Sequence, residues 1–187
     1  MYDYVKEKLG CQDSQMIIVG RSIGSGIATI LASQRPDAGS LFLVSPFTSI
    51  HAVLADQLPK WLGCLLPLLK CAVVNYFDNL SLIGRIRMPT FFLHGQRDQV
   101  VPFKLSQELI KAKVQGESML IDPPRMTHND YINWESDLGT EGMRFMERQK
   151  VGANASAVDA AQLLLSARNV AAVQENLKLV SAQLLTN

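Results

Sequence analysis

The stretch that decides the fold is Met16-Ile17-Ile18-Val19-Gly20-Arg21-Ser22-Ile23-Gly24. Four consecutive apolar residues that end at a glycine are typical of a strand buried on both faces. The segment that follows, Ile23 to Gln34, predicts a helix and is rich in small residues. A G-x-S-x-G pattern between a buried strand and a helix predicts a nucleophile elbow with Ser22 at the tip of a tight turn.

The elbow makes specific demands on its neighbours. Side chains two residues before and after the nucleophile would collide with the strand and the helix, so Gly20 and Gly24 are expected to relieve this crowding. The backbone N–H of Ile23 would face the position where an oxyanion forms. A phosphate-binding loop is disfavoured because no Lys-Ser/Thr pair follows and the spacing is not G-x-G-x-x-G. A turn that merely favours Gly and Ser is the alternative without chemistry.

Further apolar runs predict the rest of the sheet. Residues 41–44, 91–93 and 118–121 are short and apolar, and helical patterns occupy 2–9, 103–113 and 131–148. This alternation indicates a parallel α/β sheet with flanking helices. Residues 48–87, with Trp61 and several leucines, are too long for a simple crossover and predict a helical cap insertion.

The composition shifts to Ala, Val, Leu, Ser, Asn and Gln from Val151 to Asn187, and Gly152 marks the break. The apolar residues Val170, Val173, Leu177, Val180 and Leu184 recur at spacings of three and four, which predicts an amphipathic helix. We therefore divide the chain into a domain at 1–148 and a helical C-terminal extension at 149–187. The helix fits docking on its own domain and self-association equally well.

Charge and cysteine content exclude several classes of protein. The 187 residues carry 18 Lys plus Arg against 17 Asp plus Glu, a net charge of +1, which argues against a nucleic-acid binder. No apolar run approaches the roughly 18 residues of a membrane span, so no transmembrane segment is predicted. Cys11, Cys64 and Cys71 are few and odd in number, which favours a reducing, cytoplasmic setting.

A nucleophilic serine needs a base and an acid that orients the base. Asp98 follows the run 91–93, and His128 follows the run 118–121. The carboxyl ends of parallel strands meet at one edge of a sheet, so we predict Ser22, Asp98 and His128 as the catalytic set. Asp78 is the runner-up acid, but it follows a cap helix and is predicted to be structural.

The remaining polar candidates receive structural roles. His51, at the entrance to the cap, and His94, at the end of a strand, are predicted to be structural histidines. Asn129 and Asp130 are predicted to be N-cap residues of the final helix.

Four segments together resemble one family: GRSIGSG (20–26), FDNLSLIGRI (77–86), MPTFFLHGQRDQVVPF (88–103) and THNDY (127–131). They are similar to the α/β-hydrolase superfamily, in particular to the α/β-hydrolase-domain 17 depalmitoylases and Bem46-like serine hydrolases. The resemblance covers residues 1–148. It implies Ser22 as nucleophile, Asp98 as acid, His128 as base and the Ile23 amide as an oxyanion donor, with no cofactor. Several strands precede the elbow strand in the family, so an N-terminally truncated domain is expected.

Three functions follow from these observations. The first is a serine hydrolase that cleaves carboxylic esters or thioesters through an acyl-enzyme, with protein depalmitoylation as the activity implied by the resemblance. Its substrate would be an acyl ester or a lipid-modified protein, the apolar cap around Trp61 would line an acyl pocket or be ordinary core, and peripheral membrane association is expected. The second is a catalytically incomplete hydrolase-like domain that serves as a binding or scaffold module through the helix at 170–184. A serine peptidase is the third.

Overall fold

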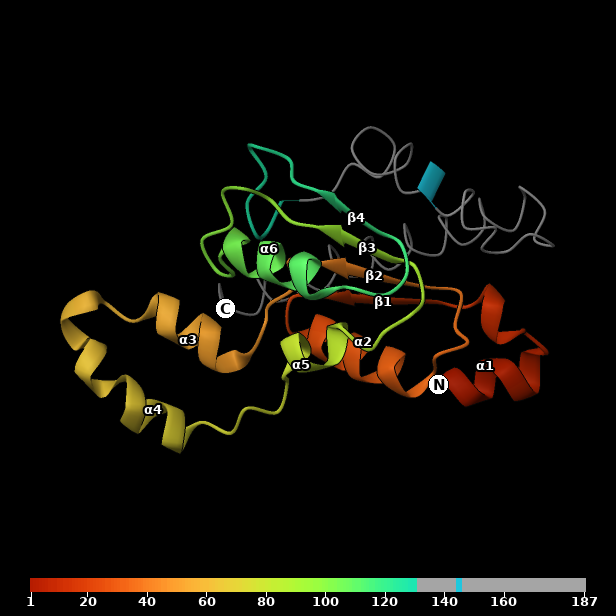
Figure 1. Cartoon of the computed structure of the whole chain (residues 1–187), viewed down its shortest axis with the longest axis horizontal. Coiled ribbons are helices and arrows are strands. Elements are labelled where there is room, and N and C mark those ends of the chain that lie inside the picture. Colours follow the sequence, from red (N-terminus) through yellow and green to blue (C-terminus); the bar gives the residue numbers. More distant parts are fainter. Residues whose placement is uncertain (131–143, 146–187) are drawn as a thin grey trace, which may run out of the picture. The chain divides into compact units, whose positions relative to one another are not determined.

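The computed structural model of the chain describes residues 1–130 and 144–145. Its centre is a four-stranded parallel sheet in the order β1-β2-β3-β4 (Figure 1). The strands are β1 (Ile17–Arg21), β2 (Ser40–Val44), β3 (Thr90–Leu93) and β4 (Ser118–Ile121). The predicted α/β architecture is therefore confirmed, with each strand start within one residue of its expected position.

Three helices match the sequence patterns. They are α1 (Tyr2–Leu9), α2 (Ile23–Gln34) and α6 (Phe103–Ala112). The first ends at Gly10, whose φ of 69° is the left-handed conformation that favours glycine at a helix end. A short 3₁₀ helix, η1 (Asp13–Gln15), leads from α1 into β1.

The segment between β2 and β3 differs from the single cap predicted over 48–87. It forms α3 (Ile50–Gln57), the 3₁₀ helix η2 (Lys60–Leu65), α4 (Leu66–Ala72) and α5 (Asn79–Ile83). Figure 1 shows η2 and α4 beyond α3, away from the sheet, whereas α5 lies against α2. Because Asn79 and Ile83 are fully buried, α5 belongs to the body of the domain rather than to a cap.

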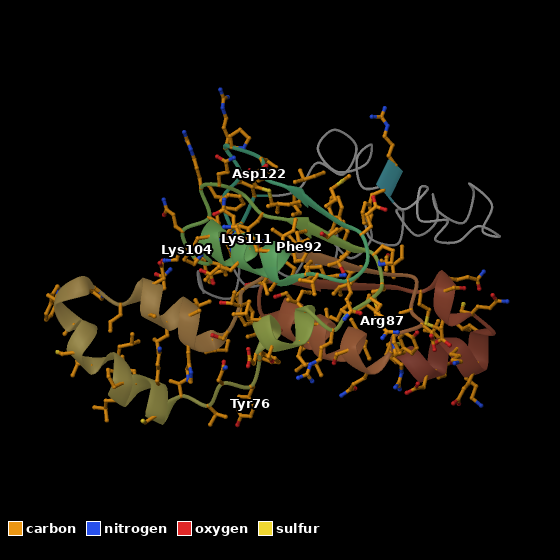
Figure 2. All side chains as sticks on the ribbon, viewed as in Figure 1. Tyr76, Arg87, Phe92, Lys104, Lys111 and Asp122 are labelled. Carbon is orange, nitrogen blue, oxygen red and sulfur yellow. The ribbon has the colours of Figure 1, made fainter. Side chains whose placement is uncertain are left out.

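The inner strands β2 and β3 are buried on both faces, which explains why they are continuous apolar runs in the sequence. The strand before the elbow differs from its prediction, because Val19 on β1 is 59% exposed. One face packs against α2, α5 and α6 and includes Leu41, Leu43 and Phe92, the last of which is labelled in Figure 2. The opposite face buries Phe42 and Phe91, which stack at 4.6 Å between ring centroids, together with the side chains of Val44, Leu93 and Phe145.

Several predictions fall outside the described residues. These are most of the helix at 131–148, the N-cap roles of Asn129 and Asp130 in that helix, and the extension at 149–187 with its amphipathic helix. In the part of the chain that is described, each helix is too short or too polar to cross a bilayer.

Candidate active site

Ser22 occupies a strained turn between β1 and α2. Its φ of 51° and ψ of −124° are unusual for a residue with a side chain, and such conformations cost about 1–3 kcal/mol. Three hydrogen bonds hold the turn: the Ser22 amide donates to the Val44 carbonyl at 2.9 Å, and the Ser25 amide and hydroxyl donate to the Ser22 carbonyl at 2.9 and 2.6 Å. The predicted elbow geometry is thus present at this serine.

The two glycines of the motif differ in their surroundings. A Cβ atom at position 20 would lie 2.5 Å from the Ala28 Cβ and from the Gly24 carbonyl oxygen, so no side chain fits there. At Gly24 no described atom lies within 4 Å of an added Cβ atom. The sequence-based expectation of crowding is therefore right for Gly20 and wrong for Gly24, because α2 approaches β1 closely only on the Gly20 side.

The three residues singled out from the sequence lie within hydrogen-bond reach of one another. His128 Nε2 is 3.0 Å from Ser22 Oγ, and His128 Nδ1 is 2.7 Å from Asp98 Oδ2. A carboxylate only accepts, so Nδ1 carries the proton and Nε2 is free to accept from the serine hydroxyl. This is the tautomer that a general base for Ser22 requires.

His128 reaches Ser22 across the width of the sheet. The strands β1 and β4 are separated by three strand spacings, about 14 Å, so the loop after β4 must run along the carboxyl ends of the strands toward β1. Residues 94–101, which we call the acid turn, contact this loop, because the Arg97 amide donates to the Met126 carbonyl at 3.1 Å. On the other side, Arg21 Nη2 donates to the His128 carbonyl oxygen at 2.5 Å.

Asp98 is buried and fully partnered. Its Oδ1 accepts the backbone N–H groups of Val100 at 2.9 Å and Val101 at 2.8 Å, and its Oδ2 accepts from His128. Burial pushes the pKa of Asp98 upward, but hydrogen bonds from His94, Val101 and His128 outweigh it and hold the pKa well below its usual value. The carboxylate therefore stays charged at neutral pH and can hold the His128 ring in one orientation.

A second histidine supports the same carboxylate. His94 is fully buried, and its Nε2 lies 3.3 Å from Asp98 Oδ2 and 2.9 Å from the Val101 carbonyl oxygen. Both are acceptors, so this nitrogen carries a proton, and in the neutral ring the Ser106 hydroxyl donates to Nδ1 at 2.5 Å. The predicted structural role of His94 agrees with its hydrogen bonds, but its contact with Asp98 had no signal in the sequence beyond its place four residues upstream.

An apolar pocket of about 300 Å³ opens beside Ser22. Helix α3 supplies much of its wall, and its apolar lining includes Phe47, Ile50, Val53, Leu54 and Val101. Trp61, expected as a lining residue or as core, is neither: it is not among the lining residues and its side chain is 79% exposed.

Helix α3 is tied to the elements that carry the acid. Gln57 Nε2 donates to the carbonyl oxygens of Gln99 and Val100 at 2.9 and 3.1 Å. Asp56 pairs with Lys104, which is labelled on α6 in Figure 2. Hydrogen bonds therefore connect helix α3, which forms part of the pocket wall, to the acid turn.

The remaining polar candidates lie in structural settings. His51 Nε2 is 2.7 Å from the Val73 carbonyl oxygen, and Asp78 caps α5 by accepting the Ser81 amide. Asp130 accepts the Thr127 amide at 2.7 Å, within the His128 loop. Among the residues that the structure describes, no group of three His, Cys, Asp or Glu side chains is arranged to hold a metal ion.

Comparison with solved structures identifies the fold. An esterase of Pyrococcus furiosus aligns with a TM-score of 0.60 at 19% identity, covering 81% of this chain and 59% of that protein. A monoacylglycerol lipase of Paleococcus ferrophilus aligns with a TM-score of 0.56 at 16% identity, covering 79% and 73%. The chain has the α/β-hydrolase fold, as predicted.

Sequence relatives point to the same class. An uncharacterized protein of Mycobacterium tuberculosis is 33% identical over 111 residues, which is 59% of this chain and 37% of that protein. A lysophosphatidylserine lipase of Danio rerio is 28% identical over 64% of this chain and 34% of its own, and protein bem46 of Schizosaccharomyces pombe is 26% identical over 68% and 42%. No family model matches the chain.

Fold and relatives together confirm the resemblance to the α/β-hydrolase superfamily. The chain spans between about a third and a half of the length of these curated relatives.

Proposed function

We propose that this chain is a serine hydrolase that cleaves carboxylic esters or thioesters through an acyl-enzyme. The observation that carries the proposal is the continuous hydrogen-bond relay from Ser22 Oγ to His128 Nε2 and from His128 Nδ1 to Asp98, built on a strained elbow. Esterases and lipases among the structural neighbours share the fold on which such relays occur.

The reaction follows from these contacts. Ser22 Oγ attacks the acyl carbonyl while His128 Nε2 takes the hydroxyl proton, and Asp98 stabilises the imidazolium. The tetrahedral oxyanion forms next to the backbone N–H of Ile23, the first residue of α2, where helix amides have no partner within the helix. Collapse breaks the bond to the leaving oxygen or sulfur, which receives the proton from His128. Water, deprotonated by His128 Nε2, then attacks the acyl carbon, and the bond to Ser22 Oγ breaks as His128 returns the proton to Ser22 and the carboxylic acid leaves.

The apolar pocket indicates the substrate class. Its lining of aliphatic and aromatic side chains suits the acyl part of an ester better than a peptide, whose amide groups would lose their hydrogen bonds there. Ligand pockets span about 300–1,000 Å³, so this pocket is at the small end. We therefore expect medium acyl chains to react faster than palmitoyl, and protein depalmitoylation to be the slower of the thioester reactions.

The test is labelling of the folded chain with a fluorophosphonate probe. Wild-type chain and Ser33→Ala, which changes a serine on the same helix, should take the label, and Ser22→Ala should not. Circular dichroism establishes that all three are folded. A folded wild-type chain that takes no label contradicts the proposal and favours the binding-module hypothesis.

The substrate class is tested with p-nitrophenyl esters and acyl thioesters whose acyl chains increase in length. Val53→Phe, which places a ring in the pocket, should lower kcat/KM for medium chains about tenfold relative to acetyl, since one group in an apolar pocket discriminates by roughly 10–200-fold. Equal effects on all chain lengths would contradict the assignment of the pocket to the acyl chain.

A further inference from the structure

An apolar arm leaves the domain beyond α3. We use this name for residues 60–76, which comprise η2, α4 and the irregular return segment toward α5. Its exposed large apolar side chains include Trp61 at 79%, Leu68 at 68% and Tyr76 at 73% of their full accessible surface. Figure 2 shows Tyr76 on the return segment, on the side away from the sheet.

The arm groups more exposed large apolar residues than any other described segment of this length. Trp61, Leu65, Leu68, Val74 and Tyr76 fall within sixteen residues, whereas the next groups hold three residues, for example Val19, Ile23 and Ile27 around the elbow. Exposed large apolar residues gathered in this way are typical of a site of interaction.

Charge and residue type select the partner. Residues 58–77 contain no Asp and no Glu, and their only charged residues are two lysines, of which Lys70 is exposed on α4. Trp and Tyr are enriched where a protein meets the headgroup region of a bilayer, and lysines without acidic neighbours complement anionic lipid. We propose that the apolar arm docks on the surface of a bilayer that contains anionic lipid.

The position of the arm relates this docking to the pocket beside Ser22. Helix α3 lines the pocket beside Ser22, and the arm begins three residues after α3 ends. A docked arm places that pocket wall next to the bilayer, so an acyl chain can enter the pocket from the lipid phase. This link to catalysis rests on the proposed function, whereas the docking itself does not.

The binding experiment uses the full chain with Trp134→Phe, which leaves Trp61 as the single tryptophan. Vesicles of phosphatidylcholine with phosphatidylserine should shift the Trp61 emission to shorter wavelength and sediment the protein. Vesicles of phosphatidylcholine alone should bind more weakly, and added salt should weaken binding to the anionic vesicles. No emission shift and no sedimentation with anionic vesicles overturns the proposal.

Matched variants locate the surface. The double variant Trp61→Ala/Leu68→Ser should weaken vesicle binding at least about tenfold, whereas Val114→Ser, at a residue 75% exposed elsewhere, should have no effect. Lys70→Glu should weaken binding to anionic vesicles about fivefold or more, and Lys111→Glu on α6 should not. Equal losses in the arm and control variants overturn the assignment.

Two further outcomes separate the alternatives. The proposal is wrong if the wild-type chain binds no vesicles and forms oligomers that dissociate in Trp61→Ala. The arm is then a self-association surface. Ser22→Ala should bind vesicles like the wild type. Loss of labelling by the probe in a wild-type chain that still binds vesicles would contradict the proposed hydrolase function alone.

Discussion

The acid turn, residues 94–101, and the apolar arm, residues 60–76, are two segments of the same domain that differ in how their side chains are buried and partnered. In the acid turn the buried polar atoms of His94 and Asp98 all have partners, and the Met126 backbone lies so close to Gly95 that no side chain fits there. In the arm, large apolar side chains face solvent, and Gly63 has open space around it. The acid turn thus holds its geometry by internal contacts, whereas the apolar arm leaves its large apolar side chains available to a partner outside the domain.

Removing the charge of Asp98 should lower turnover more than any other change considered in these two segments. Asp98→Asn removes the charge that stabilises the His128 imidazolium and alters its tautomer, so turnover should fall by about a thousandfold or more. Asp78→Asn is the matched control, because Asn also caps helices and Asp78 is exposed at the start of α5. Its turnover should stay within about twofold of wild type on that ground. Comparable losses in both variants would mean that Asp98 has no special role.

Two glycine substitutions compare the regions sterically. A Cβ atom at position 95 would lie 2.1 Å from the Met126 carbonyl oxygen, so Gly95→Ala should lower the free energy of unfolding by about 3 kcal/mol and displace the His128 loop. Gly63→Ala meets no atom within 4 Å and should change the free energy by less than about 0.5 kcal/mol. Chemical denaturation measures both, and equal values would refute the steric reading of the acid turn.

A smaller effect concerns the support of Asp98 by His94. Ser106→Ala leaves His94 Nδ1 without its partner in a fully buried site, which should lower the free energy of unfolding by about 1–3 kcal/mol. If His94 is a positioning residue, kcat should fall several-fold with KM unchanged, and Ser106→Thr, which retains the hydroxyl, should restore it. A loss of stability with kcat intact would limit His94 to a structural role.

The smallest effect is the pH dependence of the acid turn. The folded-state pKa of Asp98 lies below its ordinary value of 3.8, so its contribution to stability is fully present above that pH and is lost as the pH falls through the folded pKa. The difference in free energy of unfolding between wild type and Asp98→Asn should therefore shrink by on the order of 1 kcal/mol from pH 5 to pH 2. A difference that grows on acidification would show that burial dominates at this carboxyl.

Local patterns in the sequence were sufficient for much of the fold. The strands, α1 and α2 follow from short apolar runs, from Gly10 and from the small residues after the elbow, because these signals act within a few residues. The order of Ser22, Asp98 and His128 also sufficed to bring the three together, since all follow parallel strands.

The missed features depend on contacts between distant segments. The sequence places residues 79–83 in the cap, because the length of 48–87 carries no information about Ile83, which packs with residues of α2 and α6. The contact of His94 with Asp98 depends on Ser106 and Val101, and the exposure of Trp61 depends on how far the arm extends. A local sequence pattern predicts neither the packing partners of a residue nor its exposure to solvent.

The residues of the relay are distributed unevenly over the sheet. Ser22 follows β1 and His128 follows β4, each paired on one side among the described strands, whereas Asp98 follows the inner strand β3. Amides of outer strands exchange with solvent through local opening at lower free energy than those of inner strands. Mild denaturant should therefore abolish the proposed turnover before the bulk of the secondary structure melts, so that turnover reports local opening at β1 or β4 early.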